Sequence, residues 1–130
     1  SPKKRSGRTG TGRRAMASSV ERYGVYWVEL DPTRGSEIAK TRPALVVSDE
    51  DMNRFLGTVV VCPITSRLHP SWPSRIQTEI DGRDAEIAVD RIRTIDKARL
   101  RGFVGTIPPQ TATQVRHVIT EMYGVLSVKA

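Results

Sequence analysis

The chain has 130 residues, with 21 Lys and Arg against 14 Asp and Glu, which gives a formal net charge of +7. This length has room for one hydrophobic core, and no apolar run is long enough for a membrane span or the core of a signal peptide, so we expect a single-domain cytoplasmic protein. The single cysteine, Cys62, cannot form an internal disulfide, and neither histidine has Cys or Asp at metal-ligand spacing, so we expect no disulfide framework, metal site or other cofactor.

The basic charge is concentrated at the N-terminus. Six of the 21 Lys and Arg lie in residues 1–15, so 15 basic residues face 14 acidic ones in the rest of the chain. The N-terminal stretch has no acidic and no large apolar side chain, which predicts disorder. Met16 follows directly and is a candidate natural start, which would make residues 1–15 an addition to the native chain. We therefore expect a basic tail over residues 1–19 and one domain over residues 20–130. The high net charge is thus weak evidence for nucleic-acid binding.

The first predicted element is a strand over residues 24–30 (GVYWVEL), whose β-branched and aromatic residues alternate between two faces before Asp31-Pro32 ends the run. A loop of about ten polar, charged and glycine residues follows, near the upper end of ordinary hairpin connections. Pro43 then begins a second strand that runs to Val47, at a position where the missing N–H of proline breaks no ladder bond. A loop of this length between two strands usually carries a function.

The middle of the chain predicts a helix and a buried strand. Residues 49–55 are polar with Asp49 as a plausible N-cap, which indicates a short helix. Residues 58–64 are nearly all β-branched or apolar, which predicts a strand buried on both faces near the centre of a sheet. Pro63 is expected at a bulge or at an edge register, since a central ladder would lose a donor there.

A hairpin is expected after the loop at residues 66–73. Residues 75–80 alternate as a half-exposed strand, with Arg75, Gln77 and Glu79 on the polar side. Asp81-Gly82 makes a turn into a further strand over residues 85–89.

The C-terminal part predicts a last strand over residues 100–107 and a helix. Thr111 and Gln114 have capping-box spacing, and an apolar stripe follows at helical spacing: Val115, Val118, Ile119, Met122 and Leu126. The fold class is thus mainly β with α, in which five to six short strands form a small, strongly bent sheet or partly open barrel that the C-terminal helix covers.

Three stretches of the sequence resemble the MazF/PemK family of bacterial toxins. The first runs from Gly24 to Asp49 and matches at Gly24, Trp27, Leu30, Asp31, Pro32, Gly35, Glu37, Arg42, Pro43 and Ser48. The others are VVVCPITSR at residues 59–67 and VDRIRTIDKARL at residues 89–100. The resemblance covers roughly residues 23–126.

This resemblance implies an SH3-like small barrel with a C-terminal helix, as in the MazF and CcdB toxins, assembled as a homodimer. It implies the toxin component of a type II toxin-antitoxin system, neutralised by a cognate MazE-like antitoxin. The implied activity is metal-independent, sequence-selective cleavage of single-stranded RNA, mRNA in particular, by attack of the ribose 2′-OH, which arrests translation and growth. The residues it implies for catalysis are Arg42 and Thr65.

The chemistry of this reaction suits those two side chains. Because the 2′-OH is an internal nucleophile, the enzyme supplies alignment, charge stabilisation and proton management. A guanidinium offers a planar fork to two phosphate oxygens, and a hydroxyl can donate a third hydrogen bond. Arginine does not readily act as a base, so the proton acceptor is sought among carboxylates, with Glu37 first and Asp90 second.

Candidate RNA-binding residues surround the same strands. Phosphate contacts are expected from a group of basic and hydroxyl side chains: Arg34, Lys40, Ser66, Arg67 and Arg91. Trp72 is a candidate for stacking on an unpaired base, with a loop anchor packed on the barrel as the alternative. We expect the antitoxin to cover this cleft with an acidic, extended segment.

The sequence departs from the family pattern at several positions. Arg91 stands where glutamine is frequent, and Ser36 stands where other members can have histidine. Ala88 stands where some members have an arginine two positions before the aspartate, so an Arg–Asp pair of that kind cannot form. Two alternatives stay open: a non-enzymatic toxin that binds DNA gyrase as CcdB does, and a degenerate member that only binds an antitoxin.

Overall fold

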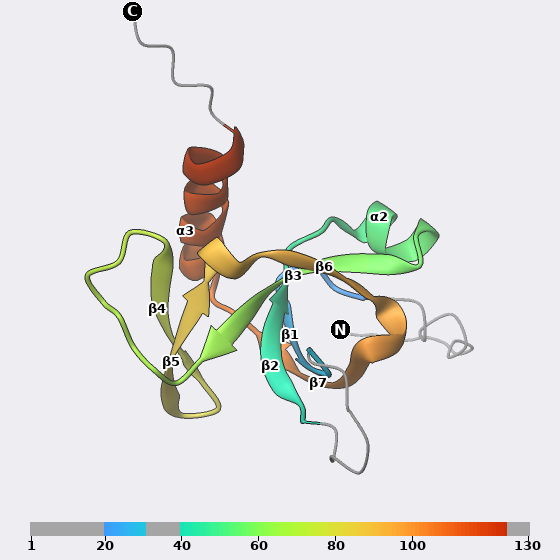
Figure 1. The fold of residues 1–130 in the computed structure, drawn as a ribbon, viewed down its shortest axis with the longest axis horizontal. Coiled ribbons are helices and arrows are strands. Elements are labelled where there is room, and N and C mark those ends of the chain that lie inside the picture. The colour runs from blue at the N-terminus through green and yellow to red at the C-terminus, as the bar shows by residue number, and fades with distance from the viewer. Residues whose placement is uncertain (1–19, 31–39, 125–130) are drawn as a thin grey trace, which may run out of the picture.

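The computed structural model describes residues 20–30 and 40–124, which form a curled sheet (Figure 1) and two α-helices. Its strands are β1 (Gly24–Val28), β2 (Arg42–Val46), β3 (Thr58–Thr65), β4 (Arg75–Ile80), β5 (Arg83–Ala88), β6 (Arg93–Asp96) and β7 (Leu100–Thr106). The α-helices are α2 (Glu50–Phe55) and α3 (Pro109–Ile119), and α3 continues into a π-helical turn over Thr120–Gly124. No helix in these ranges is long and apolar enough to cross a membrane.

The strands form one antiparallel sheet in the order β4-β5-β3-β2-β1-β7, and β6 pairs with β3 off this path. The long strand β3 connects the two parts of the sheet, because its first half pairs with β6 and its last two residues, Ile64 and Thr65, pair with β5. The last pair between β2 and β3 joins Ala44 to Pro63. Pro63 therefore lies where β3 leaves β2 for β5, the kind of edge register predicted for it.

The two faces of this sheet bury different apolar clusters. On one face, which we call the helix face, Ala112 and Val115 of α3 share a cluster with Ile64, Ile76 and Ile87 of the strands. The other face, the curl face, buries a second cluster around which β6, β3, β2, β1 and β7 curve (Figure 1): Tyr26, Val28, Leu30, Ala44, Val46, Val59, Val61 and Ile95. The sheet thus has no broad solvent-facing side at its centre, and polar groups gather where its strands end.

The predicted mainly-β fold with a C-terminal helix is confirmed, and β6 adds a short strand that the prediction did not include. Asp49 caps α2 as predicted, since its Oδ1 accepts a hydrogen bond of 2.9 Å from the N–H of Met52. The turn at Asp81-Gly82 is confirmed as well, and both residues have positive φ (54° and 79°), which suits a two-residue hairpin.

Two local predictions are wrong. Thr111 is not the N-cap of the C-terminal helix, because α3 begins at Pro109 with Pro108 as its cap and has no side-chain cap bond. Proline is pre-organised for the first helical turn and needs no such bond. Arg75 is not on a solvent-exposed side of β4 but buried. The predicted tail over residues 1–19 and the loop that contains Arg34 and Glu37 lie outside the described residues.

Candidate active site

Three polar side chains form a row across the curl face. Thr65 pairs with Glu86 between β3 and β5, and Glu86 pairs with Gln77 between β5 and β4. On the other side of β3, the pairing with β2 ends at Ala44 and Pro63, so Arg42 and Thr65 each lie two residues beyond the last pair, at adjoining ends of these strands. Directly opposed residues of an antiparallel pair lie on the same face. The row therefore crosses β3, β5 and β4 as Thr65, Glu86 and Gln77, and Arg42 lies near its Thr65 end, at the start of β2.

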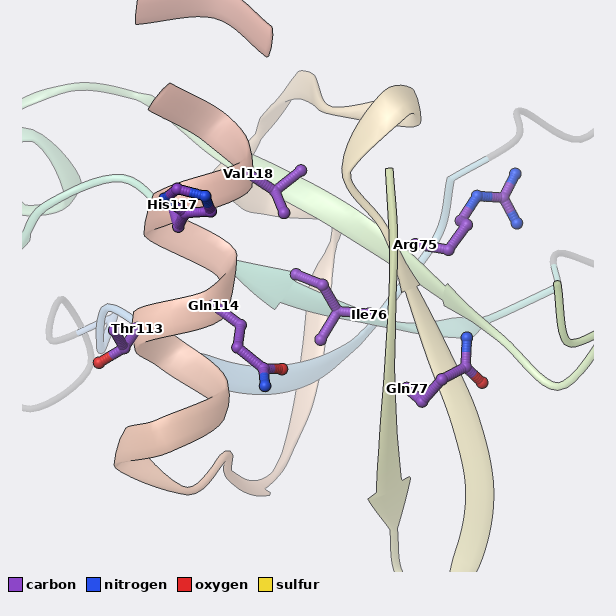
Figure 2. Close-up of a pocket in the computed structure, with 7 residues that line it drawn as sticks. All are labelled: Arg75, Ile76, Gln77, Thr113, Gln114, His117 and Val118. Atoms are coloured by element: carbon purple, nitrogen blue, oxygen red, sulfur yellow. The ribbon is translucent and has the colours of Figure 1, made fainter. Parts of the chain in front are cut away.

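This row lies on the face of the sheet that α3 does not cover. Arg42 lies two residues before Ala44 on β2, and Thr65 lies four residues after Val61 on β3, so each shares a face of its strand with that apolar residue. Ala44 and Val61 both belong to the curl-face cluster. Figure 2 shows the same division at β4, where Ile76 points toward α3 while the side chains of Arg75 and Gln77 point to the other side of the strand. The groove of about 610 Å³ between β4 and α3 therefore opens on the opposite face from the row.

The hydroxyl of Thr65 is held at the end of β3. Its Oγ1 accepts a hydrogen bond of 3.0 Å from the backbone N–H of Arg67, in a turn that leads into the exposed residues Ser66 and Arg67. A threonine hydroxyl has one hydrogen to donate beside the lone pair used here. The Thr65 side chain is half-buried, so it can offer that hydrogen to a group bound in front of the row.

Beside Thr65 lies a buried ionic network centred on Glu86. The Glu86 side chain is 0% exposed and that of Arg75 is 4% exposed, and Nη1 of Arg75 donates to Oε2 of Glu86 at 2.6 Å. Gln77 Nε2 donates to Oε1 at 2.7 Å, and the backbone N–H of His69 donates to the same oxygen. The Nδ1 atom of His69 lies 3.0 Å from Oε2. Both carboxylate oxygens of Glu86 are therefore fully engaged.

Arg75 also binds Asp90, which follows β5. Its Nε donates to Oδ1 of Asp90 at 2.7 Å, and Ser74 Oγ donates to the same oxygen at 2.9 Å. An arginine thus does pair with this aspartate, although it comes from β4 and not from position 88. These contacts bind the loop after β3 to the β4–β5 hairpin.

The network keeps both carboxylates ionised. Burial alone would raise the pKa of Glu86, but the hydrogen bonds from Gln77, His69 and Arg75 outweigh it and lower the pKa to about 2. The hydrogen bond from Arg75 is the main reason that the pKa of Asp90 is lowered as well. A carboxylate with a lowered pKa is a weak proton acceptor, so the geometry favours anchoring roles for both groups.

Trp72 lies on top of this network. Its ring stacks on that of His69 with centroids 4.0 Å apart and an interplanar angle of 26°, and Cζ of Arg75 lies 4.6 Å from its centroid. The side chain is nevertheless 45% exposed. These contacts join Trp72 to His69 of the same loop and to Arg75 of β4, and part of the side chain faces solvent.

The structure places the remaining predicted site residues as follows. Four candidates for phosphate contact are exposed to solvent: Lys40, Ser66, Arg67 and Arg91. Arg42 is exposed at the start of β2. Glu37 and Arg34 lie outside the described residues. Within the described ranges, no group of three or more His, Cys, Asp or Glu side chains could hold a metal ion.

Sequence reasoning missed three residues of this site: His69, Arg75 and Glu86. One signal was present, because Glu86 is the single charge inside the predicted strand over residues 85–89, between apolar neighbours. A buried carboxylate requires partners, so this position predicted a polar network. The identity of the partners depends on the turn of the loop after β3, which no local pattern specifies.

The fold is similar to that of proteins of known structure. A structure of MazE-MazF from Deinococcus radiodurans matches with a TM-score of 0.71 at 24% identity, covering 83% of this chain and 98% of that chain. The sequence assigns the chain to the family, since the family model described as "PemK-like, MazF-like toxin of type II toxin-antitoxin system" matches residues 21–123. The chain belongs to this family.

Two curated relatives carry names that describe an activity. Endoribonuclease EndoA of Bacillus subtilis is 40% identical over 88 residues, which cover 62% of this chain and 74% of the relative. Endoribonuclease MazF of Staphylococcus saprophyticus is 27% identical over 116 residues, which cover 85% of this chain and 97% of the relative.

Proposed function

We propose that this family member is an endoribonuclease that cleaves single-stranded RNA, mRNA in particular, without a metal ion and with a sequence preference. The observation that carries this proposal is that Arg42 and Thr65 lie at adjoining ends of β2 and β3, each two residues beyond the Ala44–Pro63 pair. The names of the two relatives support the same activity. A binding toxin of the CcdB kind has no need for this pair of side chains, because it stabilises no transition state.

The geometry supports a transphosphorylation. The ribose 2′-oxygen attacks the adjacent phosphorus, the bond to the 5′-oxygen breaks, and the products are a 2′,3′-cyclic phosphate and a 5′-hydroxyl end. Negative charge develops on the non-bridging oxygens, where the guanidinium of Arg42 provides two parallel donors. The Thr65 hydroxyl, whose oxygen is already held by the N–H of Arg67, donates its hydrogen to the same phosphate.

The proton of the 2′-OH needs an acceptor and the departing 5′-oxygen needs a donor. Asp90 suits this role poorly, because Arg75 and Ser74 occupy its carboxylate and lower its pKa. Glu37, which precedes β2 in the chain, is the carboxylate we assign as the general base that takes the proton of the 2′-OH. A solvent water molecule gives its proton to the departing 5′-oxygen, which becomes the 5′-hydroxyl. The RNA strand on either side is bound by the exposed side chains of Lys40, Ser66, Arg67 and Arg91, with Arg34 added from the same loop as Glu37.

The remaining parts of the proposal concern partners and location. We infer a homodimer in the cytoplasm that is neutralised by a MazE-like antitoxin, since a related structure contains MazE together with MazF. An acidic, extended antitoxin segment would bind the same exposed basic side chains as RNA and so exclude it. Cleavage of mRNA would arrest translation and growth when the antitoxin is absent.

The test is cleavage of a long unstructured RNA by the purified protein in EDTA, with the ends mapped by sequencing. We expect discrete cuts with 5′-hydroxyl ends, at least a hundredfold slower with Arg42→Ala, because removal of one preorganised donor typically costs that much. Arg54→Ala is the matched control, since Arg54 is an exposed arginine on α2. Full cleavage by Arg42→Ala would refute the assignment of the site. No cleavage by the wild type would favour a gyrase-binding toxin or a member that only binds antitoxin.

A further inference from the structure

Only one face of the Trp72 ring is covered by the loop that carries it. His69 and Arg75 lie 4.0 Å and 4.6 Å from its centroid, and Nδ1 of His69 is 3.2 Å from Nη1 of Arg75. If the His69 ring and the Arg75 guanidinium lay on opposite faces of the indole, their centres would be separated by the sum of their distances from the indole centroid. That separation is too long for the contact between Nδ1 of His69 and Nη1 of Arg75. His69 and Arg75 therefore back the same face, and the opposite face accounts for the exposure of the side chain, 45%.

The backing of this ring is fixed by buried groups. The Glu86 carboxylate binds both the ring and the backbone N–H of His69, and it binds the guanidinium of Arg75. Two backbone hydrogen bonds fix the loop on both sides of the tryptophan. The N–H of Trp72 donates to the carbonyl oxygen of His69 at 3.0 Å, and the N–H of Arg75 donates to the carbonyl oxygen of Trp72 at 3.1 Å. A flat surface held in this way loses little conformational entropy when a ligand stacks on it.

The Trp72 ring with its backing by His69 and Arg75, which we call the platform, lies next to Thr65. Glu86 is the cross-strand neighbour of Thr65 on the same face, and neighbouring strands are about 5 Å apart. Trp72 stands over His69 and Arg75, which bind Glu86 directly. A nucleotide next to a phosphate held at Thr65 is therefore within reach of the open face of the indole.

We propose that the open face of Trp72 is a stacking site for an unpaired RNA base beside the scissile phosphate, held in position by the buried side chain of Glu86. This inference rests on the proposed ribonuclease function. The loop that carries Trp72 exposes Ser66, Arg67 and Ser71 as well as Leu68, so it offers hydrogen bonds and positive charge to the sugar and phosphate of a nucleotide whose base stacks on the ring. Unpaired bases stack on aromatic side chains in a sequence-tolerant way, so the platform contributes to binding and orientation.

The test compares steady-state cleavage by three variants on the RNA mapped for the wild type. Trp72→Leu should raise KM about tenfold with little change in kcat, because one stacked base typically contributes a factor of this size. Trp72→Tyr keeps an aromatic ring and should have a KM close to that of the wild type. Phe55→Leu is the control, since Phe55 is an aromatic side chain on α2 that is 76% exposed. An unchanged KM for Trp72→Leu, or an equal rise for Phe55→Leu, would overturn the proposal.

A binding measurement separates this inference from the ribonuclease function itself. In a Trp27→Phe background Trp72 is the sole tryptophan, and a short 2′-O-methyl RNA of mixed sequence, which lacks the nucleophile, should quench its fluorescence saturably. Absence of quenching would overturn the stacking site even if the wild type cleaves RNA. Quenching would support it even if cleavage fails. Quenching by a polyglutamate peptide but not by RNA would assign this face to an acidic protein segment and overturn the proposal.

Discussion

Replacing Glu86 by glutamine should destabilise the protein by about 3 kcal/mol at neutral pH. Lowering a carboxyl pKa from 4.5 to about 2 corresponds to about this free energy of folding. Removal of one partner from a buried ion pair gives a similar range, about 3–5 kcal/mol. Glutamine keeps one acceptor oxygen, but its NH₂ group would face donors that now bind a carboxylate oxygen. Of its two carboxylate partners, Arg75 would then keep only that of Asp90.

The assay is urea unfolding of wild type and Glu86→Gln at equal protein concentration over a range of pH. Because the folded-state pKa of Glu86 lies below its unfolded value, its contribution is complete above about pH 4.5 and is lost as the pH falls toward 2. The difference between the two proteins should therefore shrink over that window. Glu79→Gln, an exposed carboxylate on β4, is the matched control and should change stability by less than about 0.5 kcal/mol. A difference below about 1 kcal/mol at pH 7, or one that is constant down to pH 2.5, would refute this reasoning.

Three further predictions test other parts of the structure. Thr65→Val should lower kcat at least about a hundredfold with an unchanged circular dichroism spectrum, whereas Thr65→Ser should retain most activity; a fully active valine variant would exclude a role for the hydroxyl. Cys62, whose pKa burial raises to about 12, should resist a thiol reagent at pH 8 until urea unfolds the chain, and rapid labelling of the native protein would contradict that burial. Asp49→Ala should cost about 1 kcal/mol in urea unfolding through loss of the α2 cap, and an unchanged midpoint would count against the cap.

The sequence predicted those features that depend on short patterns. The cap of α2 and the turn at Asp81-Gly82 are local and were found, and Pro63 proved to mark the place where β3 changes partners. The catalytic roles proposed for Arg42 and Thr65 could be inferred only through resemblance to the family, since neither residue type is distinctive at the end of a strand.

The rest of the site required the tertiary structure. Alternation along β4 places Arg75 on the same face as the exposed residues Gln77 and Glu79. The alternation does not indicate whether solvent or a loop that folds back over the strand covers each residue of that face. That loop carries His69 and Trp72, and its position depends on a carboxylate 17 residues away from His69. β6 was missed for a related reason, because a four-residue strand carries too little pattern to stand out.

If the proposed function holds, the polar row also determines at which point of its synthesis the chain becomes an active ribonuclease. Its members come from β3, β4 and β5, and β5 is the last of these to be synthesised. A nascent chain that has not yet released residues 83–88 contains Arg42 and Thr65 but lacks the strand that flanks Thr65 and the Glu86 carboxylate that fixes the following loop. Fragments that end before β5, whether from abortive translation or proteolysis, should therefore not cleave RNA.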